Sequence, residues 1–196
     1  MRKIFAVILM VSLIMPVTIF SQDTEEPDMP VFCQEYLGQI SFVKGRVVQL
    51  AEAFPQEKYT WRPAEGIRSV SEVYLHTAGA NYMSIQVSGF ELPAGVDLES
   101  DREAWEKTTT NKTEIISSLN QSFDALSEMV KKVGEEDLNK IVKVFGMEMS
   151  QRNFMITMLG HIHEHLGQSI AYARMNGVVP PWSAPPPPPS NLKMEQ

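Results

Sequence analysis

The residues of this chain that are best suited to chemistry are its four histidines. His161, His163 and His165 lie close together, and His76 lies far upstream. At about 100° per residue, His161 and His165 project from one face of a helix, whereas His163 projects from the other side. A lone histidine such as His76 is more often a hydrogen-bonded core or surface residue. If it joins the pair, however, three imidazoles with open positions for water suit a divalent transition metal such as zinc, nickel or iron.

Polar residues continue the helix face that carries the histidine pair. Gln168 and Tyr172 extend the stripe of His161 and His165, so an amide and a phenol lie where a core helix is normally apolar. We interpret Gln168 and Tyr172 as residues that orient a substrate or a metal ligand. Glu164 lies about 60° from His161 around the helix and is a candidate proton acceptor, although an exposed charge is its more common role.

Several other catalytic motifs are excluded by spacing. A His-Glu-x-x-His zinc motif would need a histidine at Gly167, and a di-iron bundle would need Glu-x-x-His pairs, which neither His76 nor His165 provides. The sequence also lacks a Gly-x-Ser-x-Gly nucleophile elbow and a glycine-rich phosphate loop followed by lysine. With Cys33 as its single cysteine, the chain cannot form an intrachain disulfide, a thiolate zinc cage or an iron–sulfur cluster.

Length and charge narrow the class of protein further. The chain has 196 residues, which suits one ordinary domain and excludes a large multidomain enzyme. Its formal net charge is -7 and it has no run of lysine and arginine, so nucleic acid is not an expected partner. We expect a small-molecule substrate of unknown identity, and dimerisation through a helix face stays open.

The first residues are typical of a secretory signal peptide. Arg2 and Lys3 precede an almost wholly apolar run from Ile4 to Met15, and a breaker and small residues follow up to Ser21. The apolar run is short for a membrane span and is followed at once by an acidic stretch. We therefore predict a signal peptide over 1–21, an acidic linker over 22–30, export to the periplasm or the medium, and no stable membrane span after cleavage.

Helical periodicity dominates the rest of the chain. Apolar residues recur at spacings of three and four in four long segments, and the second of these begins with a capping box at Ser69 and Glu72. The four predicted helices run from Val31 to Phe54, from Ser69 to about Val87, from about Ile115 to Gly134 and from Gln151 to Asn176. We also expect a helical turn over 99–107, before the third helix, and a short hairpin around Gly146, before the fourth.

These elements predict an all-α fold, an antiparallel four-helix bundle over 31–179 in which facing helices project ligands into one shared cavity. The tail over 180–196 contains five consecutive prolines, which favour polyproline II and cannot join a helix. We expect this tail to be a surface arm.

Four segments together resemble the DinB/YfiT-like superfamily, and they span nearly the whole chain after the predicted signal peptide. The resemblance implies a four-helix bundle with a divalent metal held by three histidines, which correspond here to His76, His161 and His165. The segments are Trp61-Arg-Pro63, Ser69 to His76, His161 to Gln168, and Tyr172 to Trp182 with its Pro180-Pro181 pair.

The family that the chain resembles includes thiol-dependent S-transferases and isomerases, metal-dependent hydrolases and proteins without an assigned reaction. An exported protein works in a generally oxidising compartment, which disfavours chemistry that needs a free thiol. We therefore favour a metal-dependent hydrolase that uses metal-activated water, with Gln168 and Tyr172 orienting the substrate. A transferase that uses a metal-bound thiolate and a non-catalytic metal-binding or interaction module are the alternatives.

Overall fold

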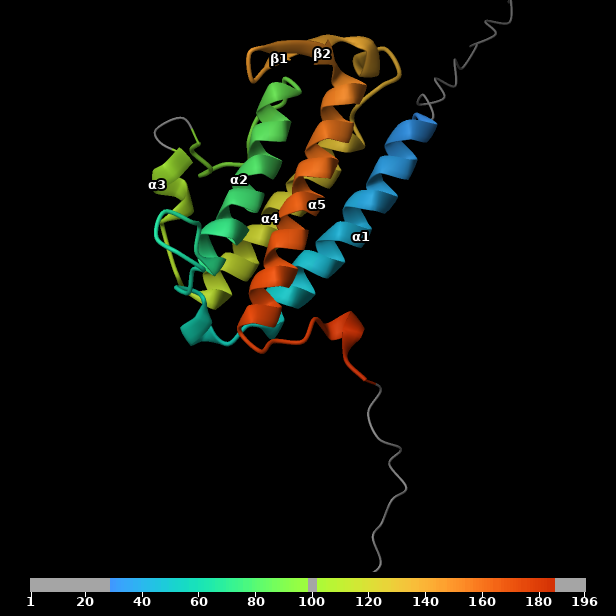
Figure 1. Cartoon of the computed structure of the whole chain (residues 1–196). Helices are drawn as coiled ribbons and strands as arrows, with labels where there is room; N and C mark the ends of the chain where they lie inside the picture. Colours follow the sequence, from blue (N-terminus) through green and yellow to red (C-terminus); the bar gives the residue numbers. More distant parts are fainter. Residues whose placement is uncertain (1–28, 99–101, 186–196) are drawn as a thin grey trace, which may run out of the picture.

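Four long helices form the body of the protein within residues 29–98 and 102–185, which are the residues that the computed structural model describes (Figure 1). The predicted signal peptide, most of the predicted linker and residues 186–196 of the tail lie outside the described residues. The long helices are α1 (Val31–Ala53), α2 (Val70–Val87), α4 (Lys112–Val130) and α5 (Gln151–Met175). A short helix, α3 (Arg102–Glu106), precedes α4, and the strands β1 (Ile141–Val144) and β2 (Met147–Ser150) precede α5.

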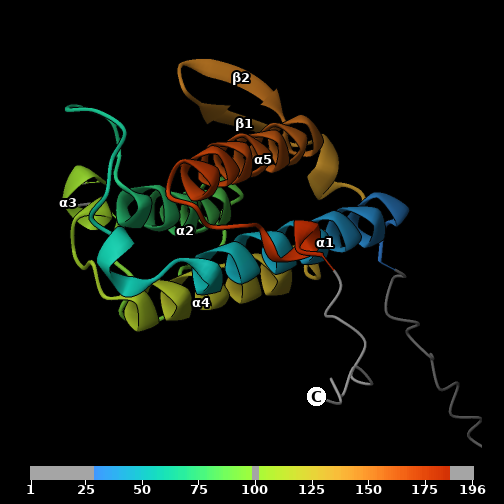
Figure 2. The same cartoon turned by 60° about the horizontal axis from the view of Figure 1, so that its bottom comes forward.

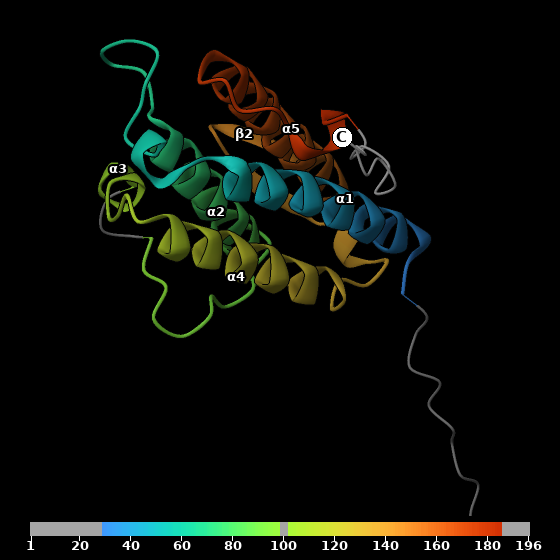
Figure 3. The ribbon, with the colours of Figure 1, turned by 90° about the horizontal axis from the view of Figure 1, so that it is seen from below.

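The long helices form a four-helix bundle, as the periodicity predicts. Each of α1 and α2 packs against both α4 and α5 (Figure 2). Helices α1 and α2 run antiparallel, and so do α4 and α5 (Figure 3). Helices α2 and α4 run in the same direction, because the long connection that contains α3 returns the chain to the end of the bundle where α2 begins (Figure 1).

The predicted apolar stripes form the core of this bundle. In α1 the side chains at spacings of three and four face inward and are at most 3% exposed, namely Tyr36, Ile40, Val43, Val47 and Leu50. Helix α4 contributes a matching stripe that includes Ile115, Leu119 and Phe123. Helix α4 differs from the prediction at both ends: it begins at Lys112, where Asn111 caps it, and it ends at Val130.

Helix α2 is the most enclosed of the four. Fourteen of its 18 residues are buried, including polar ones such as Thr77 and Asn81. Helices α3, α4 and α5 and strand β1 all contact it. The predicted capping box is confirmed: the Ser69 hydroxyl accepts a hydrogen bond from the Glu72 backbone N–H, and the Glu72 carboxylate accepts one from the Ser69 backbone N–H. This cap sets where the helix that carries His76 begins.

The predicted hairpin is present and packs across α2 and α5. Its strands pair antiparallel, with Val144 opposite Met147, so that Phe145 and Gly146 alone form the turn. Both turn residues have positive φ, 54° and 72°, which is the geometry of a type I′ turn. Beneath the hairpin lies a small hydrophobic cluster, separate from the main core, made of Ala80, Met83, Val144, Phe154 and Met158.

The described residues contain no helix that is both long and apolar enough to cross a membrane.

The capping box leads to a prediction about stability. Replacing Ser69 with alanine leaves a backbone N–H of the first turn of α2 without its partner, so Ser69→Ala should lower the free energy of unfolding by about 1 kcal/mol. Urea unfolding followed by circular dichroism measures this change. Ser117→Ala, at an exposed position within α4, is the control and should change stability by less than about 0.5 kcal/mol. Equal losses in the two variants would contradict the importance of the cap.

Candidate metal centre

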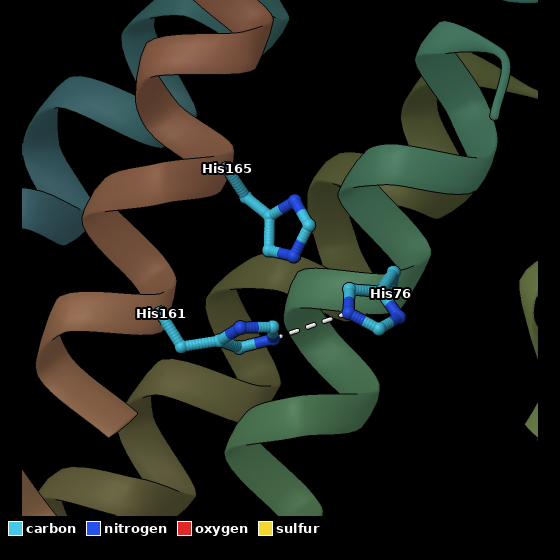
Figure 4. Close-up of side chains that lie close together, drawn as sticks. All are labelled: His76, His161 and His165. Carbon is cyan, nitrogen blue, oxygen red and sulfur yellow. Dashed lines mark hydrogen bonds between the residues drawn. The ribbon is translucent and has the colours of Figure 1, made fainter. Parts of the chain in front are cut away.

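Three histidines from two helices converge on one point between α2 and α5. His76 comes from α2, and His161 and His165 come from successive turns of α5 (Figure 4). The Nε2 atoms of His76 and His161 are 3.1 Å apart, and the three candidate ligand atoms all lie within 4.8 Å of one another. The ring of His165 lies 4.6 Å from that of His76 and 4.5 Å from that of His161, measured between centroids. The structure therefore brings together the three histidines that the sequence singles out.

The spacing of these nitrogens fits a transition metal. Two nitrogens that each bind a tetrahedral ion at about 2.05 Å are about 3.3 Å apart. The Nε2 atoms of His76 and His161 lie close to this separation. All the donors are imidazole nitrogens, which favours zinc, nickel or iron over magnesium or calcium. The three side chains are thus a group that could hold a divalent transition metal.

Glu106 determines how His76 is oriented. The Glu106 Oε1 atom lies 2.6 Å from Nδ1 of His76, and Arg68 donates two hydrogen bonds to the same carboxylate, at 2.6 and 2.9 Å. Burial disfavours the charge of Glu106, but the hydrogen bonds from His76 and Arg68 outweigh it and lower the pKa of this carboxyl to about 2. An ionised carboxylate only accepts hydrogen bonds, so Nδ1 of His76 carries the proton, and Nε2 directs its lone pair toward Nε2 of His161.

Gln168 and Tyr172 orient His165 in the same way. The Gln168 amide donates to the Tyr172 hydroxyl at 2.9 Å, which turns its carbonyl oxygen toward Nδ1 of His165, also at 2.9 Å. Nδ1 of His165 therefore donates, and its Nε2 is free to bind an ion. The Tyr172 hydroxyl in turn donates to the backbone carbonyl of Arg68 at 3.1 Å, so Arg68 supports both His76 and His165. The edge of Trp61 packs against the Tyr172 ring, with centroids 5.3 Å apart.

Burial keeps the imidazoles in the form that binds metals. Desolvation, together with the neighbouring His165, His76 and Arg68, lowers the pKa of His161 to about 4. Desolvation also lowers the pKa of His165, although the hydrogen bond to Gln168 partly opposes this effect. Both rings are therefore neutral near pH 7, and a neutral imidazole is the species that donates a lone pair to a metal.

The other two candidates on α5 lie toward solvent. His163 is exposed, as its place on the helix predicts, and its Nδ1 contacts the backbone carbonyl of Leu159 at 2.9 Å. The Glu164 side chain is 79% exposed, and its carboxylate lies 3.9 Å from Nδ1 of His161. Glu164 is therefore beside the histidine cluster and not within it.

Sequence reasoning missed two residues of this site, Arg68 and Glu106. Glu106 lies 30 positions from His76 and 38 from Arg68, on the short helix α3, so no periodic pattern connects the three. Arg68 directly precedes the predicted capping box, but nothing in that motif indicates a partner on another helix. An acidic residue in the connection between two bundle helices was the only available signal, and it is a weak one.

The sequence matches the family model of the DinB superfamily over residues 39–169, which is more than half of the chain. The chain belongs to the DinB superfamily. The matched region includes all three histidines of the cluster and Glu106, which contacts His76.

Solved structures confirm the DinB fold. A DinB-like protein from Bacillus cereus is 18% identical, with a TM-score of 0.64 over 76% of this chain and 95% of that one. A DinB-like protein from Bacillus subtilis is also 18% identical, with a TM-score of 0.58 over 74% of this chain and 93% of that one. A conserved protein from Enterococcus faecalis is 15% identical, with a TM-score of 0.57 over 72% and 95% of the two chains. A comparison with curated proteins found no match.

The convergence of the histidines predicts which variants lose metal. His76→Ala, His161→Ala and His165→Ala should each lower the bound zinc, nickel or iron from about one ion per chain to well below stoichiometry, because two imidazoles bind far more weakly than three. Elemental analysis of purified protein measures the ratio. His163→Ala removes an exposed histidine from the same helix and should keep the metal. Stoichiometric metal in all three cluster variants would show that the histidines are not ligands.

The hydrogen bond from His76 predicts a graded effect at Glu106. Glu106→Ala leaves Nδ1 of His76 without an acceptor and should weaken metal affinity by about 10- to 100-fold, without abolishing binding. Competition with a coloured chelator gives the dissociation constant. Glu103→Ala is the matched control, because Glu103 is on the same short helix and pairs with Lys107 at the surface. If both variants bind metal as tightly as the unchanged protein, Glu106 has no role in positioning the ligand.

Proposed function

We propose that this DinB protein is a metal-dependent hydrolase that cleaves an ester or amide bond in a small molecule. The observation that carries the proposal is the set of three converging imidazoles, of which His76 and His165 have their tautomers held by Glu106 and by the Gln168–Tyr172 pair. His76, His161 and His165 would hold the ion, and a pocket lies beside His76 and His161, which line one end of it. A metal site with three protein ligands and open positions is typical of catalysis and not of a structural role.

A divalent ion held by His76, His161 and His165 would lower the pKa of water and polarise the carbonyl of a substrate. The chain's own residues hold the geometry that this chemistry needs. Glu106 and Gln168 hold His76 and His165 with the Nε2 lone pair of each ring directed at the site. Arg68 connects the hydrogen bonds behind His76 with those behind His165 into one network. Rigid positioning of this kind reduces the rearrangement required during the reaction.

The hydrolytic step needs a proton acceptor. The water oxygen bonds to the acyl carbon, the bond from that carbon to the leaving oxygen or nitrogen breaks, one proton passes from water to the leaving group, and the acid releases the other. Glu106 is poorly suited to accept a proton, because His76 and Arg68 occupy its oxygens and its pKa is low. Glu164 is exposed, and its carboxylate lies 3.9 Å from Nδ1 of His161, the ring nitrogen that does not face His76. We assign the acceptor role to this residue, acting through one intervening water.

The proposal predicts metal-dependent turnover. Protein reconstituted with zinc, nickel or iron should hydrolyse 4-nitrophenyl esters at least about 100-fold faster than the chelated, metal-free protein. His161→Ala should match the metal-free rate, and His163→Ala should match the unchanged protein. Release of 4-nitrophenolate measures the rate, and an unchanged rate after chelation would reject the hydrolase.

The visible spectrum of cobalt-substituted protein tests the alternative function, an S-transferase that uses a metal-bound thiolate. In cobalt-substituted protein, a thiol that binds the ion changes the visible spectrum through a sulfur-to-cobalt charge-transfer band. A spectrum that small thiols leave unchanged would weaken the S-transferase alternative. A saturable change on thiol addition, together with absent ester hydrolysis, would favour the S-transferase instead.

We also propose that the enzyme acts after export, on the basis of the apolar segment Ile4 to Met15 and the small residues that follow it. The intact mass of protein recovered from the exported fraction would then correspond to a chain that begins at Gln22. A mass that retains Arg2 and Lys3 would contradict cleavage.

A further inference from the structure

A small apolar pocket lies directly beside two of the three histidines. It has a volume of about 100 Å³ and is lined at one end by His76, His161 and Glu106. The rest of its wall is apolar and comes from α2, α3, the hairpin and the segment after α2, through Gly79, Ala80, Met83, Leu98, Trp105 and Phe145. A group bound in this pocket would lie next to the histidine cluster.

The pocket follows one face of α2. Gly79, Ala80 and Met83 are three, four and seven positions after His76, so they continue the face that His76 presents. Gly79 allows the indole of Trp105 to approach, since a Cβ at this position would lie 3.1 Å from two indole atoms. The Trp105 indole N–H donates to the backbone carbonyl of Leu75 at 3.0 Å, which holds the ring against the helix. The Trp105 side of the pocket is therefore fixed against α2 by this hydrogen bond and by the close contact with Gly79.

The outer wall comes from the turn of the hairpin, and its residue is unusual there. Type I′ turns favour asparagine or glycine at the first central position, because bulky residues rarely adopt positive φ. This chain instead has Phe145, with φ of 54° and 59% of its surface exposed, and this residue lines the pocket. Neither turn formation nor core packing requires an aromatic residue at this position. Backbone strain that the fold itself does not need often marks a residue used for binding.

We propose that this pocket binds a short, uncharged alkyl group of the substrate and that Phe145 is a specificity-determining residue. The inference rests on the proposed hydrolase, and it specifies an ester or amide whose acyl group is a chain of about three or four carbons. A benzene ring occupies an apolar cavity of roughly 150 Å³, so this smaller pocket suits a short chain better. A charged end does not suit it, because the polar groups of its lining all belong to the histidine cluster and Glu106.

Binding to the metal-free protein tests the pocket without any reaction. In protein with isotope-labelled methionine methyl groups, 1-butanol should shift the Met83 signal saturably, and 1,4-butanediol should bind about ten-fold more weakly because it places a second hydroxyl in an apolar pocket. Phe145→Asn should weaken 1-butanol binding by about five-fold through the loss of apolar contact area. The same substitution should raise the melting temperature by about 2 °C, because asparagine suits the turn.

Met147→Asn is the matched control. Met147 lies in the same hairpin and is 53% exposed, but it does not line the pocket. Its replacement should leave 1-butanol binding within two-fold of the unchanged protein. If 1-butanol does not shift the Met83 signal, or if both variants weaken binding equally, the proposed pocket is wrong.

An ester series separates this inference from the proposed function. For the metal-loaded enzyme, kcat/KM for 4-nitrophenyl butanoate should exceed that for the acetate by about ten-fold, from two buried methylene groups, and should fall again at the octanoate. Phe145→Asn should reduce the butanoate preference to about two-fold. Hydrolysis with no chain-length preference would overturn the pocket and keep the hydrolase. Binding of 1-butanol without any hydrolysis would overturn the hydrolase and keep the pocket.

Discussion

A neutral imidazole inside a helical bundle needs a partner for each of its two ring nitrogens, and this requirement organises the site. His76 lies on α2, the helix with fourteen of its 18 residues buried, and desolvation lowers the pKa of both His161 and His165. Glu106 and Gln168 satisfy the outer nitrogens of His76 and His165. The inner nitrogens of His76 and His161 then face each other at 3.1 Å. Because Nδ1 of His76 donates to Glu106, Nε2 of His76 accepts the hydrogen bond from Nε2 of His161. A divalent cation held by both nitrogens would take the place of that proton.

The long helices carry the three histidines, and the connections between the helices carry most of the residues around them. The three histidines come from α2 and α5, whose packing sets the positions of the three imidazoles. The residues around them come from connections: Arg68 precedes α2, Glu106 and Trp105 lie on α3, and Phe145 forms the hairpin turn. Functional differences between proteins of one fold generally reside in such segments, because the scaffold tolerates changes there. Solved structures that are 15–18% identical to this chain share its fold.

The proposed hydrolase therefore depends on the site and not on family membership. Two features of the site distinguish it from a simple metal-binding module. One is the coupling of two ligand histidines through Arg68, which contacts Glu106 with its side chain and Tyr172 with its carbonyl. The other is the apolar pocket that opens beside His76 and His161. A module that only holds a metal needs neither a vacant side nor an adjoining pocket.

Local patterns in the sequence determined the helices, the capping box at Ser69, the hairpin around Gly146 and the placement of His161 and His165 on one face of α5. Each of these follows from interactions within a few residues, such as helical periodicity, capping and turn geometry. The family resemblance implied that His76 joins this pair, and the tertiary structure brings the three imidazoles together. Only the tertiary structure decided that Glu106 and Arg68 support His76 and that Phe145 lines the pocket. Those contacts join residues that are 30 to 104 positions apart, and such contacts depend on how helices and connections pack together. A spacing rule applies along a single helix, so it has no means of specifying a side chain that arrives from a different one.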